Sequence, residues 1–139
     1  MTYEVRIERL PRYLHATVTG TNSVAAVSGY LDDIAEACEK QVCFRVLIHE
    51  QLEGERLGWD EVFSIASEGA MKSMGMFHAI AYVDEQMGDM SHFAETVALN
   101  RGMPVRTFDN VADAEKWLLG LVEGPDEQRI FLDEDPTDA

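Results

Sequence analysis

The feature that most constrains this chain is a repeated order, in which a short apolar run precedes a segment whose apolar residues have helical spacing. The apolar runs within 43–48, 76–83 and 105–108 are dense enough for strands buried on both faces. In the segment after each run, apolar residues recur at intervals of three and four. Strands that alternate with such helices pair in parallel through right-handed crossovers. The order therefore predicts an α/β fold with a parallel sheet.

The start of the chain follows a different pattern. Residues 3–9 and 13–19 alternate between apolar and polar side chains, which indicates two half-buried strands joined as an antiparallel hairpin. A capped helix is expected over 23–40, and a polar loop over 49–58. We therefore expect a five-stranded mixed sheet with four main helices, lying mainly on one face, in the order β-β-α-β-α-β-α-β-α.

Length and charge divide the chain into one domain and a tail. A chain of 139 residues is long enough for one domain with a real core, here residues 1–122. Residues 123–139 hold seven acids and one arginine, so this acidic C-terminal tail contributes −6 of the net charge of −15. Its apolar triad Ile130-Phe131-Leu132 is either incidental or docks onto a groove of its own body or of a second subunit.

The charge balance excludes some partners. Only 11 residues are basic, three of them lysines, and they are scattered, which argues against nucleic acid and limits membrane contact to peripheral binding. No apolar run approaches the roughly 20 residues that span a bilayer. The first residues enter strand-like alternation, so no secretory signal is expected. Cys38 and Cys43 lie in apolar patterns and are predicted to be buried free thiols in a reducing cytoplasm.

Several segments carry a family resemblance. They are Ala16-Thr17-Val18-Thr19-Gly20, Arg45-Val46-Leu47-Ile48, Ile80-Ala81-Tyr82-Val83-Asp84, and the ending Val105-Arg106-Thr107-Phe108-Asp109 with Ala114-Glu115-Lys116-Trp117-Leu118. Together with the element order, they resemble the SpoIIAA-like family, whose fold is that of the STAS domain and is compared with the CRAL-TRIO domain. The resemblance covers about residues 3–121. It implies a small cytoplasmic bacterial domain, often a homodimer, from a family whose uncharacterised members are proposed to bind apolar or membrane ligands.

One departure from related proteins matters. Anti-sigma factor antagonists carry a phosphorylatable serine or threonine after the third strand. Here no hydroxyl residue occurs between Phe44 and Phe63, and a phosphate would meet Glu50, Glu53 and Glu55. A phosphorylation switch is therefore not expected.

The first candidate site is rich in methionine and aromatic residues. Methionine fills gaps in cores, and it also forms deformable walls around apolar ligands. On the second reading, an apolar slot between the second and third helices is lined by Trp59, Phe63, Met71, Met74, Met76, Phe77 and Met90.

The second candidate site is the rim beyond the carboxyl ends of the parallel strands, where ligands of open α/β sheets bind. His49, Glu50 and Asp84 are expected there. Such side chains either cap helices and meet solvent, or bind a cation or transfer protons. No nucleophile motif, phosphate loop or metal-ligand spacing is present, so we predict no catalytic residue, metal or cofactor.

The leading hypothesis is thus a non-enzymatic module that binds a small apolar, amphipathic or lipid-like ligand, or uses the same surface for a protein partner or a homodimer. The alternative is a regulatory protein-interaction domain that resembles an anti-sigma factor antagonist without the phosphorylation site.

Overall fold

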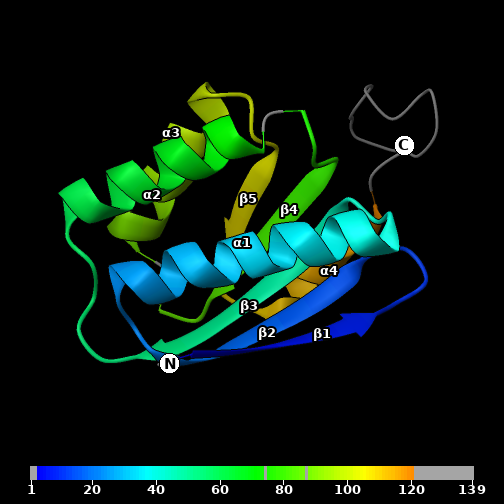
Figure 1. Ribbon diagram of the computed structural model, residues 1–139, viewed down its shortest axis with the longest axis horizontal. Helices are drawn as coiled ribbons and strands as arrows, with labels where there is room; N and C mark the ends of the chain where they lie inside the picture. The colour runs from blue at the N-terminus through cyan, green and yellow to red at the C-terminus, as the bar shows by residue number, and fades with distance from the viewer. Residues whose placement is uncertain (1–2, 74, 87, 121–139) are drawn as a thin grey trace.

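The computed structural model describes residues 3–73, 75–86 and 88–120, which form five strands and four helices (Figure 1). The elements are β1 (Tyr3–Arg9), β2 (Leu14–Thr21), α1 (Val24–Gln41), β3 (Arg45–Glu53), α2 (Trp59–Lys72), β4 (Ala79–Asp84), α3 (Asp89–Asn100), β5 (Val105–Phe108) and α4 (Val111–Leu119). The predicted acidic tail lies outside the described residues.

The five strands make one sheet in the order β1-β2-β3-β4-β5. β1 and β2 are antiparallel, with Arg9 opposite Leu14 beside the turn. The pairs β2–β3, β3–β4 and β4–β5 are parallel. The predicted mixed sheet, its antiparallel hairpin and the order of strands and helices are confirmed.

The helices cover the two faces unequally. α1, α2 and α3 lie on one face, while α4 packs against β3 and β4 from behind (Figure 1). Because strand residues alternate in direction, Ile48 joins the cluster under α1 with Ile34, whereas Leu47 joins the cluster under α4 with Leu118. Cys38, on the inner side of α1, and Cys43, just before β3, are both free and buried, as predicted. The wider layer under three helices is the one that contains the cavity described below.

Two predicted boundaries are wrong. β3 continues to Glu53 instead of giving way to a loop at His49, because β2 is long enough to pair with it as far as Thr21 opposite Glu53. β4 begins at Ala79 and not at Met76. Polar residues are accepted in the last part of β3 because β4 ends at Asp84, which leaves that part paired on one side only.

Replacing Asn110 with alanine should lower the free energy of unfolding by about 1 kcal/mol. The Asn110 side-chain oxygen accepts a hydrogen bond from the backbone N–H of Asp113 at 2.8 Å and so caps α4. Denaturant unfolding measures the loss. Asn100→Ala, at the exposed end of α3, is the matched control and should cost less than ~0.5 kcal/mol. Equal losses in the two variants would contradict a role for the cap.

Candidate functional site

A cavity of about 180 Å³ lies between the sheet and the three helices on its wider face. β3 and β4 contribute Ile48 and Ile80 to its floor, and α1 contributes Val27 and Leu31 to one wall. The strand alternation that buries Ile48 also directs Glu50 to the same face, two residues further along.

Small side chains on the opposite wall explain why the core is not filled here. α2 faces the cavity with Ala66, Gly69 and Ala70, and α3 faces it with Ala94 and Ala98. A Cβ atom added at Gly69 would meet no atom within 4 Å, so the space beside it is open. Packed protein interiors rarely leave voids of this size, which makes the cavity the first candidate for a binding site.

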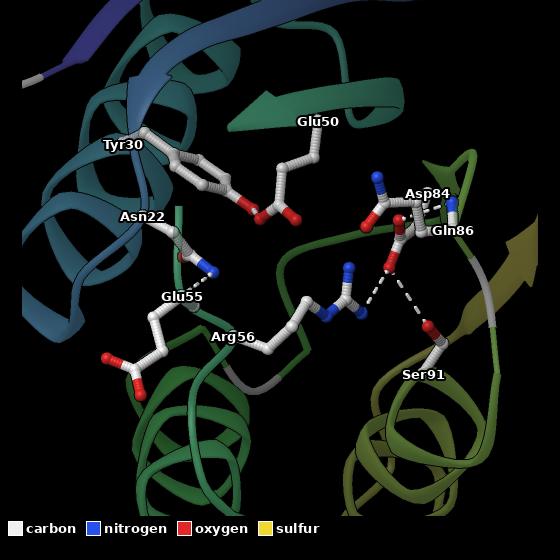
Figure 2. Close-up of polar contacts among 8 residues, drawn as sticks. All are labelled: Asn22, Tyr30, Glu50, Glu55, Arg56, Asp84, Gln86 and Ser91. Carbon is white, nitrogen blue, oxygen red and sulfur yellow. Dashed lines mark hydrogen bonds and ion pairs between the residues drawn. The ribbon is translucent and has the colours of Figure 1, made fainter. Parts of the chain in front are cut away.

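One end of the cavity is polar and contains the half-buried carboxyl group of Glu50. The Tyr30 hydroxyl donates a hydrogen bond to Glu50 Oε2 at 2.6 Å (Figure 2), and the Tyr82 hydroxyl also hydrogen-bonds to Glu50. Burial raises the pKa of Glu50 above its ordinary 4.5, the two tyrosines oppose this rise, and the charge of Asp84 adds to it. Burial and then the Glu50 charge raise the pKa of both tyrosines well above 10, so their hydroxyls stay protonated.

A second polar group lies beside the first. Figure 2 shows Arg56 extending between Glu50 and Asp84, where its Nη2 donates to Asp84 Oδ2 at 2.9 Å. The hydroxyl of Ser91 and the backbone N–H of Gln86 also donate to Asp84, at 3.1 and 2.9 Å. Burial alone would raise the pKa of Asp84, but these three donors outweigh it and hold the pKa below its usual value. Asp84 is therefore a buried carboxylate whose charge is already compensated.

The loop between β3 and α2 holds Arg56 in place. Asn22 Nδ2 donates to the backbone oxygen of Glu55 at 3.1 Å, which ties this loop to the start of α1 (Figure 2). Gly54, at the start of the loop, has φ 105°, a left-handed conformation that glycine adopts without steric cost.

The polar side chains around the cavity carry more negative than positive charge. The lining residues include three carboxylates, Glu50, Asp84 and Glu95, and one cation, Arg56. Glu95 is satisfied by Thr107, whose backbone N–H and hydroxyl both donate to its Oε1 at 2.7 Å. Within the part of the chain that the structure describes, only the two tyrosines donate to Glu50, so its carboxylate keeps unused acceptor positions.

The predicted rim is divided by the sheet. Glu50 and Asp84 line the cavity. His49 faces the opposite side, where its Nε2 lies 3.0 Å from Glu85 Oε2 and its ring lies 6.5 Å from that of His15. Successive strand residues point to opposite faces, so His49 and Glu50 cannot share one site.

The predicted slot coincides with the cavity only in part. Met90 lines it, whereas Met76 and Phe77 pack against the core under α1, and Met74 lies outside the described residues. Three further members are 52%, 44% and 67% exposed and do not line the cavity, namely Trp59, Phe63 and Met71.

The orientation of α2 explains this difference. α2 turns its Ala66 and Gly69 side inward, which leaves Trp59 and Phe63 on the outer side next to α3. Trp59 makes an edge contact with Phe93, at 4.9 Å between ring centroids. The Phe63 ring lies under the guanidinium of Arg101, 5.3 Å from its centroid.

Three important residues were not predicted. Tyr30 has the same helical spacing as Val27 and Ile34, and Tyr82 lies two residues before Asp84 on its strand, so periodicity could have placed both on the cavity face. No periodic pattern predicts the place of Arg56 in the site, because this residue lies in a loop.

Comparison with models of known protein families finds none that matches the chain. Among curated proteins, none is similar enough to count as a relative. Within the described residues, no three His, Cys, Asp or Glu side chains are grouped so that they could hold a metal ion. Likewise, no helix in this part of the chain combines the length and apolar character needed to cross a membrane.

The pKa of Glu50 should lie above 4.5 and rise further when Tyr30 is replaced with phenylalanine, because the hydrogen bond from Tyr30 lowers it. A ¹³C NMR titration of the glutamate Cδ signals measures both values, and Glu50→Gln assigns the signal. A pKa at or below 4.5 in the wild type, or a lower one in Tyr30→Phe, would contradict this account of the site.

The same shift predicts the sign of a pH effect on stability. At a pH just above 4.5, a carboxyl group with a raised pKa in the folded chain binds more protons in the folded chain than in the unfolded chain. Glu50 therefore contributes stability at low pH that is lost as the pH rises through its folded pKa. Denaturant unfolding should show a smaller fall over this window in Glu50→Gln than in the wild type. A steeper fall in the variant would contradict the raised pKa.

Proposed function

We propose that this protein is a non-enzymatic binding module that takes a small amphipathic molecule into the cavity under α1, α2 and α3. The observation that carries the proposal is an apolar cavity that ends at the half-buried carboxyl group of Glu50, which has unused acceptor positions. Ligand sites in proteins combine these two properties, an apolar wall and a few fixed polar groups.

The volume of the cavity limits the size of the ligand. At ~30 Å³ for each water in the liquid, 180 Å³ corresponds to about six water molecules. An engineered apolar cavity of ~150 Å³ binds benzene. The ligand is therefore a short branched or cyclic hydrocarbon with a head group, and a long acyl chain would extend out of the cavity.

The polar end selects the head group. A ligand carboxylate would approach Glu50, Asp84 and Glu95, and the nearby cation is already paired with Asp84. An ammonium or hydroxyl group can instead donate to the remaining lone pairs of Glu50. We therefore expect the cavity to prefer amines and alcohols over carboxylic acids.

The resemblance to the SpoIIAA-like family supports this proposal but is not its main evidence. The strand order and the helix-covered face are those expected for a SpoIIAA-like, STAS-type domain, and the resemblance implies binding of apolar ligands. We propose that the chain is such a domain, with a short amphipathic ligand in place of a lipid.

Three molecules with one cyclohexyl ring and different heads test the proposal, namely cyclohexylmethylamine, cyclohexylmethanol and cyclohexanecarboxylate. Titration calorimetry on the full chain at pH 7 should rank the amine first and the carboxylate last, at least about tenfold apart, or ~1.4 kcal/mol. If none of the three binds, or the carboxylate binds best, the proposed chemistry is wrong.

Gly69 offers a matched pair of variants. Gly69→Leu places a side chain into the open space and should weaken amine binding at least tenfold, which is ~1.4 kcal/mol. Gly69→Ala should keep binding and raise the free energy of unfolding by about 0.5–1 kcal/mol, because alanine is the better helix former. Unchanged affinity in a folded Gly69→Leu would place the ligand elsewhere.

A further inference from the structure

Arg56 has two carboxylates within its electrostatic reach at the polar end of the cavity. It is the one cation among the described residues that line the cavity, and Figure 2 shows its guanidinium between Glu50 and Asp84. Its Nη2 donates to Asp84 Oδ2 at 2.9 Å, and its positive charge also acts on Glu50. The guanidinium therefore has two possible partners and is hydrogen-bonded to Asp84.

Asp84 holds the guanidinium because its own carboxylate is fixed. The Asp84 side chain is only 7% exposed, whereas that of Arg56 is 44% exposed. The backbone N–H of Gln86 donates to Asp84 Oδ1, and the hydroxyl of Ser91 donates to Oδ2. A hydrogen bond between charged groups is about twice as strong as one between neutral groups. A carboxylate oriented by two further donors is thus a firm anchor for the longer and more exposed arginine.

Glu50 is the acceptor that the proposed ligand needs. It receives hydrogen bonds from Tyr30 and Tyr82, and its remaining lone pairs are acceptor positions for a ligand. A guanidinium can bind a carboxylate with two N–H groups at once. If Arg56 turned from Asp84 to Glu50, it would therefore occupy the positions that an ammonium or hydroxyl group would use.

We infer that Asp84 is a positioning residue, which holds Arg56 away from Glu50 and so keeps the Glu50 carboxylate open to the ligand. This inference rests on the proposed function, because it gives Asp84 a role in that same site. The loop that carries Arg56 is tied to the start of α1 by the hydrogen bond from Asn22 to the backbone of Glu55. Rotation of the Arg56 side chain therefore decides which carboxylate it binds.

Replacing Asp84 with asparagine should release Arg56. Asparagine keeps the size of the side chain, but one of its two polar atoms is an NH₂ group that cannot accept a hydrogen bond. Arg56 should then bind Glu50, and titration calorimetry should show cyclohexylmethylamine binding at least about tenfold more weakly than to the wild type. In Asp84→Asn/Arg56→Gln no guanidinium competes for Glu50, so the amine affinity should return to within about threefold of the wild type.

The pKa of Glu50 separates this role from a general loss of structure, and measuring it requires no ligand. The charge of Asp84 raises this pKa, and that of Arg56 lowers it. A ¹³C NMR titration should therefore give a lower Glu50 pKa in Asp84→Asn than in the wild type and a higher one in Arg56→Gln. In the double variant the two changes oppose each other, so its pKa should lie between those of the single variants.

Glu85→Gln is the matched control. It removes the same charge from the residue next to Asp84, but Glu85 pairs with His49 on the opposite side of the sheet. This variant should leave both the Glu50 pKa and the amine affinity as they are in the wild type.

Two results would overturn the inference. One is a Glu50 pKa that stays the same or rises in Asp84→Asn, and the other is an amine affinity that the double variant does not restore. If Asp84→Asn does not fold, Arg56→Gln still decides, because Arg56 is exposed and an unchanged Glu50 pKa there would also overturn the inference. A wild type that binds no amine, with the expected order of pKa values, would contradict the proposed function while confirming that Asp84 holds Arg56.

Discussion

The partial burial of the Glu50 carboxyl group between two tyrosine hydroxyls is the interaction on which the rest of the candidate site depends. β3 lies between β2 and β4, and its register places Glu50 beside Asp84 on the face covered by three helices. A carboxyl group that loses part of its contact with water is costly unless hydrogen-bond donors reach it, and the hydroxyls of Tyr30 and Tyr82 are such donors. The same need explains why Arg56 pairs with Asp84 only a short distance away. A molecule in the cavity would lie beside this acceptor-rich network.

The fold could be predicted from the sequence because the spacing of apolar residues differs between strands and helices. Glu50 and Asp84 were also predictable, since each comes within two residues of the end of an apolar run that indicates a buried strand. The cavity itself was not, because Gly69 on a helical stripe gives no sign of whether a neighbour fills the space beside it. The exposed position of Trp59 and Phe63 depends on how far α2 is rotated about its axis, which the packing of the whole layer decides.

The two ends of β3 have opposite electrostatic character. The cavity near its end is lined by three carboxylates and one arginine, and a second hollow at its start is lined by three arginines. Three of the 11 basic residues of the chain therefore lie together at the start of β3.

The most direct test of the central claim is a crystal structure of the protein with cyclohexylmethylamine. The account predicts electron density for the ring between Leu31 and Ile65, with the amine nitrogen about 2.7–3.2 Å from a Glu50 oxygen. A cavity closed by repacked side chains would contradict the account, as would a ring bound on the outer surface at Trp59 and Phe63.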